Sequence, residues 1–128
     1  MVRMTATPSA PLSIGALSRQ TGASIRSLRH YDDHGLLASN RAANGYRVFP
    51  PGAVARVRQI QRLIASGFSL AEICAFPDCM LMIEGAAMCP ETTPAQRRRL
   101  EQIERQIADL ERRRTRLLAM LAEGAARS

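Results

Sequence analysis

Lysine is absent from this sequence, and all 18 of its basic side chains are arginine. With 11 acidic residues, the formal net charge is +7. Arginine carries a planar, permanently charged fork that pairs with phosphate groups and with the edge of guanine. The excess therefore favours a nucleic-acid partner. A GC-rich genome would also replace lysine codons by arginine codons, so the charge alone does not decide the function.

Long hydrophobic runs are also missing. No stretch approaches the roughly 18 apolar residues that a membrane span needs, and the first residues, MVRMTATPSAPL, contain no apolar core of a leader peptide. We therefore expect a cytoplasmic protein with no membrane partner. Cysteine is scarce: three residues, an odd number without a secretory signal, favour free thiols over a disulfide framework.

The length of 128 residues suits one compact domain with an extension and is too short for two full domains. The motifs described below divide the sequence into five predicted segments. They are a mobile tail (1–11), a folded domain (12–76), a connecting loop that contains Cys and Met (77–92), a long helix (93–123) and a short tail (124–128).

Two short helices are predicted at the start of the folded domain. Ser13 is a suitable N-cap for the first, and Gly22 is a suitable C-terminal stop. Ser24 caps the second helix, which we expect Ile25 and Leu28 to hold against the core. Two helices joined by a tight glycine-containing turn, with arginines on the exposed face of the second, fit a helix-turn-helix.

A β-hairpin, or wing, is predicted next. The pair Asn44-Gly45 tolerates positive φ and marks a tight hairpin turn, and the strand-forming segment YRVF follows at 46–49. Arg41 lies before the turn and Arg47 lies after it. The hairpin would therefore carry one arginine on each arm.

Two further helices complete the predicted domain. The pair Pro50-Pro51 opens the first, since proline is tolerated at the first helical position. The expected apolar face of this helix consists of Val54, Val57, Ile60 or Gln61, and Ile64. A capping box, Ser69 to Glu72, starts the second helix. Cys74 lies at core spacing in this helix, so we expect a buried structural thiol.

A long helix is predicted from a capping box, Thr93 to Gln96, up to Gly124, because no glycine or proline interrupts it after Pro94. Its apolar residues follow the three-four spacing of a coiled-coil seam: Leu100, Ile103, Ile107, Leu110, Leu117 and Leu121. Arg114 interrupts this seam without an explanation. A helix of roughly 45 Å is too long for one small core to cover, so it needs a partner.

Together these motifs resemble the MerR family of transcriptional regulators. The resemblance is carried by SIGALSRQTGASIRSLRHYDDHGLL (13–37), NGYRVF (44–49) and GFSLAEI (67–73), followed by one long helix. It runs continuously from about Leu12 to Ile73. The resemblance implies a mainly α fold in which a winged helix-turn-helix DNA-binding domain precedes a dimerisation helix, paired as an antiparallel coiled coil in the dimer.

The resemblance also implies a function. A homodimer would place its two recognition helices in successive major grooves of a pseudo-palindromic promoter site, and distortion of the bound DNA would align the promoter for RNA polymerase. An isologous dimer of helix-turn-helix units calls for a two-fold site on physical grounds as well. The expected partners are therefore double-stranded DNA, a second copy of the chain and RNA polymerase.

The DNA-contact positions of the family map onto seven residues of this chain: Arg26, Arg29, His30, Tyr31, Arg41, Tyr46 and Arg47. Arginine can bind guanine or phosphate, and a histidine ring or tyrosine hydroxyl can reach backbone oxygens or base edges. The alternative is a solvated side chain for each arginine, and a ring that packs the wing against the domain for Tyr31 and Tyr46. Ser13 and Ser24 cap helices whose N-termini can receive a phosphate.

A metal site on the recognition helix is a weaker hypothesis. His30 and His34 are four residues apart, as two imidazoles that share a metal on a helix would be, with Asp32 and Asp33 between them. The DNA-binding pattern already accounts for this turn of the helix. The ordinary role of the two aspartates is a helix surface or an ion pair with a nearby arginine.

Cys79 and Cys89 bracket a segment that also contains Met80, Met82 and Met88. Thiolates and thioethers suit Cu(I) or another soft ion, and two exposed thiols can also sense oxidants or electrophiles. The third alternative is purely structural packing. In metal-sensing relatives a cysteine precedes the dimerisation helix, as Cys89 does, but the ligand loop that follows that helix has no counterpart here. No cofactor is therefore certain.

Two other functions are weighed against an effector-controlled regulator. One is an effector-free architectural or developmental DNA-binding protein with structural cysteines. The other is a thiol enzyme or metal-handling protein, which the sequence disfavours because no general base lies near Cys79 or Cys89 and no Cys-x-x-Cys pair is present. We therefore predict a regulator and not an enzyme.

Overall fold

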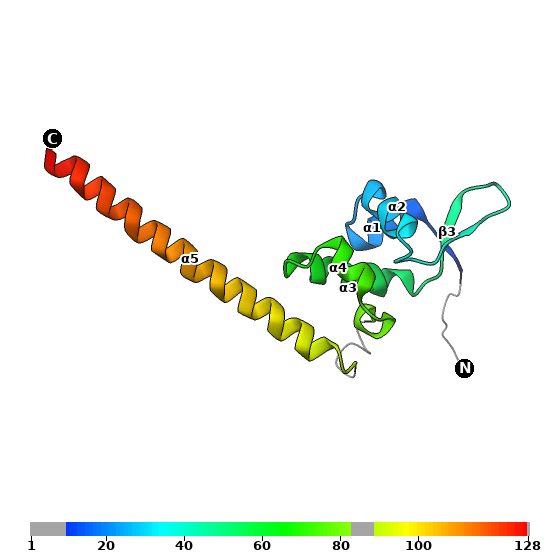
Figure 1. Cartoon of the computed structure of the whole chain (residues 1–128). Coiled ribbons are helices and arrows are strands. Elements are labelled where there is room, and N and C mark those ends of the chain that lie inside the picture. Colours follow the sequence, from blue (N-terminus) through cyan, green and yellow to red (C-terminus); the bar gives the residue numbers. More distant parts are fainter. Residues whose placement is uncertain (1–9, 83–88, 128) are drawn as a thin grey trace, which may run out of the picture. The chain divides into compact units, whose positions relative to one another are not determined.

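The computed structural model describes residues 10–82 and 89–127. The chain divides into two units, the first ending at Cys89 and the second beginning at Pro90. The first unit contains β1 (Leu12–Ser13), α1 (Ile14–Thr21), α2 (Ile25–Asp33), β2 (Asn40–Arg41), β3 (Arg47–Phe49), α3 (Ala53–Ala65), α4 (Leu70–Ala75) and the short 3₁₀ helix η2 (Asp78–Leu81) (Figure 1). The second contains α5 (Thr92–Arg127). The predicted mainly α fold, with a small wing and a long last helix, is confirmed.

Helix α1 begins and ends at its predicted capping residues, and α2 begins at its predicted cap. Ser13 Oγ accepts a hydrogen bond from the Ala16 N–H at 3.0 Å, and Ser24 Oγ accepts one from the Ser27 N–H at 3.0 Å. Gly22 adopts φ 76°, a left-handed conformation that L side chains rarely adopt. This turn sets the direction of α2 relative to α1.

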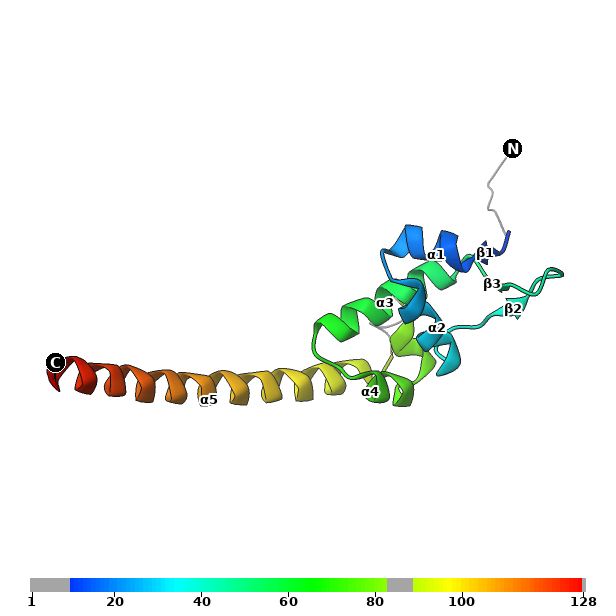
Figure 2. The same cartoon turned by 90° about the horizontal axis from the view of Figure 1, so that it is seen from above.

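The wing forms as predicted but belongs to a larger sheet. β2 and β3 pair antiparallel, with Arg41 opposite Arg47, and Gly45 at the turn has φ 85°. β1 also pairs antiparallel with β3, so the strand order is β1-β3-β2 (Figure 2). The two-residue β1 was not predicted, because the sequence indicates only a helix cap at Ser13. Its partner in the sheet, Val48, lies far along the chain.

The core of the first unit lies between the helices and β3. The largest fully buried side chains of its cluster are Phe49, Leu17, Leu28, Ile60, Ile73, Leu81 and Val57. The prediction that Ile25 holds α2 to the core is wrong, since its side chain is 40% exposed. Leu28, the other predicted anchor, is fully buried, and Tyr31 shares its face three residues further along the helix.

Helix α3 starts later than predicted. Pro50 to Gly52 form a turn, in which the Ala53 N–H donates to the Pro50 carbonyl at 2.9 Å. Leu63 is buried, whereas Ile64, predicted to lie on the apolar face, is 41% exposed. The later start does not change which face of α3 is buried. Val57 and Ile60 lie on that face as predicted, and Leu63 follows three residues later on the same side.

Helix α4 confirms the capping box but corrects the prediction for Cys74. Ser69 Oγ accepts from the Glu72 N–H at 3.1 Å, and Glu72 Oε1 accepts from the Ser69 N–H at 2.8 Å. Ile73 is fully buried, whereas Cys74 is an exposed free thiol. A six-residue helix buries one narrow face, and the next residue is rotated by about 100° from it.

The segment predicted as a connecting loop is partly structured. η2 places Met80 and Leu81 in buried positions, and Gln59 on α3 donates from Nε2 to the Met80 carbonyl at 3.0 Å. Cys79 and Cys89 form a disulfide, with their Cα atoms 5.6 Å apart. The expectation of free thiols without a disulfide is therefore wrong, because an odd cysteine count does not reveal which pair lies within bridging distance.

The long helix α5 exceeds its predicted length. It comprises 36 residues, or about 54 Å at the usual rise. It begins at Thr92, so Thr93 lies inside the helix and not at its cap, and it continues through Gly124 to Arg127. Glycine weakens a helix interior by about 1 kcal/mol without ending it. Within the described ranges, no helix combines the length and apolarity needed to cross a membrane.

Candidate nucleic-acid interface

Helix α2 presents a basic face to solvent. Leu28 and Tyr31 are buried on one side, while Arg26, Arg29 and His30 are exposed on the other. A shallow depression runs along this exposed side and is lined by Ile25, Arg26, Ser27, Arg29, His30 and Asp33. The helix can therefore approach a polyanion without disturbing the core. DNA contact by these side chains stays a prediction.

The two capping serines are engaged in local hydrogen bonds. Ser13 and Ser24 each satisfy one N–H of the following helix turn, and Ser24 Oγ also donates to Ser27 Oγ at 2.9 Å. The caps fix where α1 and α2 begin. A phosphate contact at either N-terminus is not tested by these bonds.

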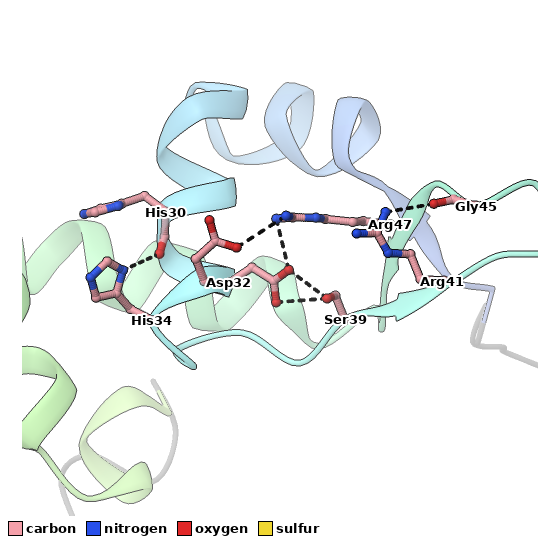
Figure 3. Close-up of polar contacts among 8 residues, drawn as sticks. His30, Asp32, His34, Ser39, Arg41, Gly45 and Arg47 are labelled. Atoms are coloured by element: carbon pink, nitrogen blue, oxygen red, sulfur yellow. Dashed lines mark hydrogen bonds and ion pairs between the residues drawn. The ribbon is translucent and has the colours of Figure 1, made fainter.

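His30 on α2 and His34, the C-cap of this helix, lie close together. Their ring centroids are 4.2 Å apart in an edge-on arrangement, and His34 Nδ1 lies 2.8 Å from the His30 carbonyl oxygen (Figure 3). One nitrogen of His34 is thereby occupied by the backbone. Among the described residues, no group of three or more His, Cys, Asp or Glu side chains is placed to hold a metal ion.

The two tyrosines have different surroundings. Tyr31 is 7% exposed and belongs to the core, and this burial raises the pKa of its hydroxyl above the usual value of 10.0. Tyr46 is 73% exposed near the tip of the wing. The ring of Tyr31 therefore packs in the core and that of Tyr46 does not, and DNA contact by either residue stays a prediction.

The two wing arginines also differ. Arg41 is exposed, and its Nη1 donates to the Gly45 carbonyl at 2.8 Å, which ties the arm to the turn (Figure 3). Arg47 points the other way, toward the end of α2, where it pairs with Asp32 at 3.2 Å and Asp33 at 3.3 Å. Of the two alternatives given for the aspartates, helix surface or ion pair, the ion pair with a nearby arginine is present.

Ser39 was not singled out by sequence reasoning. Its hydroxyl lies 2.9 Å from Asp32 Oδ1 and 2.8 Å from Asp32 Oδ2. Ser39 lies 7 residues after Asp32, and Arg47 lies 14 residues after Asp33, so neither a helical nor a strand period connects them. The turn at Asn44-Gly45 was the only local signal that the chain returns toward α2.

The cysteines do not form the predicted pair of free thiols. The sulfurs of Cys79 and Cys89 are bonded to each other, so in this state they cannot act as thiolate ligands. Cys74 is the free thiol, and its Sγ lies 3.9 Å from the His34 carbonyl oxygen. Met82 is exposed, and Met88 lies outside the described residues.

Comparison with known families gives two matches along the chain. Residues 12–75 match the model described as MerR HTH family regulatory protein, and residues 54–120 match the one described as MerR, DNA binding. The nodulation protein NolA from Bradyrhizobium sp. (strain NC92) is 37% identical over 112 residues, which cover 87% of this chain and 44% of that protein. The chain spans less than half the length of the NolA proteins it matches.

Two solved structures are similar in fold and sequence. HiNmlR, a MerR family regulator lacking the sensor domain and bound to promoter DNA, is 28% identical with a TM-score of 0.58, covering 80% of this chain and 77% of that chain. A MerR family transcriptional regulator from Bacillus cereus is 28% identical with a TM-score of 0.62, covering 87% and 78%.

Proposed function

The chain belongs to the MerR family of helix-turn-helix regulatory proteins, and from this premise we propose that it acts as a homodimer on a pseudo-palindromic promoter site. It is a DNA-binding transcriptional regulator, a class of protein that is not enzymatic. One observation supports the binding of a promoter site. Helix α2 exposes a basic face, and Leu28 on the opposite face anchors the helix in the core.

The apolar stripe of α5 supports the homodimer. Leu100, Ile107, Leu110, Leu117 and Leu121 are each between 51% and 69% exposed. With Ile103, and with Arg114 at the interrupted position, they follow the spacing of three and four residues of a two-stranded seam. A second copy would supply the same stripe. In the antiparallel pairing proposed here, the two winged units would read half-sites about one helical turn of DNA apart.

We further propose that binding distorts the promoter DNA and so controls its use by RNA polymerase in the cytoplasm. The similarity to a family regulator bound to promoter DNA supports a promoter site. Distortion would be visible as altered reactivity of the central base pairs to a conformation-sensitive nuclease. A chain that binds without distorting the DNA or changing transcription would instead be the architectural alternative.

The DNA-binding face is tested by Arg26→Ala. A duplex site selected by the wild-type chain from a random-sequence library is used as the probe, and the Kd is measured by fluorescence anisotropy. Loss of a bidentate arginine contact is expected to weaken binding by about 1–3 kcal/mol. Arg116→Ala, which removes one exposed charge from α5, is the matched control and should change the Kd little. Unchanged affinity in Arg26→Ala would contradict the assignment.

A second candidate function, thiol-redox control of DNA binding, is favoured by the Cys79–Cys89 disulfide. Cys79 lies in η2, which Arg56 also contacts through an ion pair with Asp78 at 3.0 Å. Disulfides in the cytosol are rare and are usually catalytic or redox-sensing. Reduction by a dithiol would break the S–S bond, leave two thiols on the chain and oxidise the dithiol to its own disulfide.

One set of measurements distinguishes redox control from the other two roles of these cysteines, soft-metal sensing and structural packing. DNA affinity and promoter activity are measured for oxidised and dithiol-reduced protein, with and without Cu(I). Reduction is expected to change the Kd of the wild type by about fivefold or more, and to have no effect on the Cys79→Ser/Cys89→Ser variant. Cys74→Ser is the matched control and should behave as the wild type. Equal binding in both states would mean that the disulfide is structural.

A further inference from the structure

A charged cluster joins the wing to the end of the recognition helix. Arg47 on β3 places Nη1 3.2 Å from Asp32 Oδ2 and Nη2 3.3 Å from Asp33 Oδ1, at the last two residues of α2. Ser39, in the connection between α2 and β2, donates its hydroxyl to the same Asp32 carboxylate. Figure 3 shows the guanidinium directed into this cluster and away from the wing tip. Helix α2, the connection that follows it and strand β3 thus meet at Asp32.

The guanidinium of Arg47 is committed to this contact. Its side chain is 23% exposed and that of Asp32 is 13% exposed, so the pair is largely shielded from solvent. Nη1 is itself buried and has no hydrogen-bond partner of good geometry among the described residues, so the Asp32 carboxylate supplies its counter-charge. With Nη1 buried and Nη2 bonded to Asp33, the guanidinium does not present both terminal nitrogens to solvent, as bidentate binding of a phosphate would need.

The position of the two aspartates is otherwise unfavourable. Carboxylates at the C-terminal end of a helix oppose the helix dipole, and on a helix that approaches DNA they also repel the phosphates. The arms of the wing are only two and three residues long, and a hairpin this short has little stability of its own. Arg47 resolves both problems, since it neutralises the carboxylates and fixes the wing beside α2.

We propose that Arg47 is a positioning residue, which anchors the wing to α2 through Asp32 and Asp33 and does not itself bind DNA. This inference rests on the proposed DNA-binding function and is an alternative to the expectation that Arg47 contacts DNA directly. Ser39 is the third member of the anchor. Arg41, opposite Arg47 in the hairpin, is the exposed arginine of the wing and is left to meet the DNA.

The salt dependence of DNA binding tests whether Arg47 touches a phosphate. The logarithm of the binding constant is measured against that of the salt concentration, with the selected duplex used above as the probe. Each phosphate contact contributes a slope of about −0.9. Arg47→Ala is expected to weaken binding about tenfold, or about 1.4 kcal/mol, without changing the slope. A slope reduced by about 0.9 in Arg47→Ala would overturn the proposal.

A double-mutant cycle tests the partners. If Arg47 acts through the aspartates, Arg47→Ala will weaken DNA binding far less in an Asp32→Asn/Asp33→Asn background than in the wild type. If the loss is equally large in both backgrounds, Arg47 acts on the DNA directly and the proposal fails. Arg47→Lys, whose single ammonium cannot span both carboxylates, should bind with intermediate affinity and serves as the milder variant if alanine impairs folding.

Hydrogen exchange separates this inference from the proposed function, because it needs no DNA. The backbone amides of residues 40–49 are expected to exchange faster in Arg47→Ala than in the wild type, while those of α3 do not change. Unchanged exchange in the wing would overturn the anchor even if the chain binds DNA. Faster exchange in a chain that selects no duplex would support the anchor and contradict the proposed function.

Discussion

Replacing Leu110 by aspartate is expected to leave the protein monomeric and unable to hold a two-fold DNA site. Leu110 lies in the middle of the α5 seam and is 59% exposed, and burying a leucine contributes about 1.5–3 kcal/mol. A symmetric dimer contains this position twice, and each aspartate would carry an uncompensated charge into the interface at a cost of several kcal/mol. A loss of about 5 kcal/mol or more raises the dimer Kd at least a thousandfold.

Sedimentation equilibrium of the wild type and Leu110→Asp measures this loss, and the Kd for the selected duplex measures its consequence. Ala119→Asp is the matched control, since it places the same charge at an exposed site nine residues, or about two and a half turns, along α5. It faces away from Leu110 and should leave the dimer intact. A folded Leu110→Asp monomer that still binds the full site tightly would contradict the coupling of dimer and DNA binding.

Local chemistry made the short elements of the winged unit predictable from the sequence. Ser13, Ser24 and the Ser69–Glu72 capping box each satisfy backbone groups within three residues. Gly22 adopts the positive φ that the tight turn between α1 and α2 requires. Since such motifs depend on no distant partner, both ends of α1, the starts of α2 and α4 and the turn of the wing follow from them directly.

Tertiary neighbours were beyond the reach of the same reasoning. Hydrophobic spacing assigns Ile25 and Cys74 to an apolar face, but it does not say whether another element covers that face, and both are exposed. The bond between Cys79 and Cys89 and the pairing of β1 with β3 likewise depend on how separate segments meet. Such contacts leave no periodic signal in the sequence.

The candidate site divides in the same way. Exposure of Arg26, Arg29 and His30 followed from their positions opposite Leu28 on one helix. The role of Arg47 could not be predicted in this way, because a guanidinium on a wing strand can equally well contact DNA or form a structural ion pair. Its distances to the two aspartates at the end of α2 show the ion pair and support the positioning role proposed above.

Phe49→Ala is expected to have the largest effect on the stability of the winged unit. Phe49 is fully buried, ends β3 and pairs with Leu12 of β1, so its ring lies where the sheet meets the helical core. Replacing a buried phenylalanine by alanine costs about 3–5 kcal/mol. The free energy of unfolding of a small domain is only about 5–15 kcal/mol, so this substitution removes a large fraction of it.

Thermal unfolding followed by circular dichroism measures this cost, and Tyr46→Ala is the matched control from the same wing. For a domain of this size, each kcal/mol shifts the Tm by about 4–8 °C, so Phe49→Ala should melt at least about 12 °C lower than the wild type. Tyr46 is 73% exposed, and its removal should change stability by less than about 0.5 kcal/mol. If Tyr46 contacts DNA as predicted, its variant will lose affinity at unchanged Tm, so the pair separates packing from recognition within one hairpin. If the Tm of Phe49→Ala lies within a few degrees of the wild-type value, the ring of Phe49 does not contribute to stability as its burial predicts.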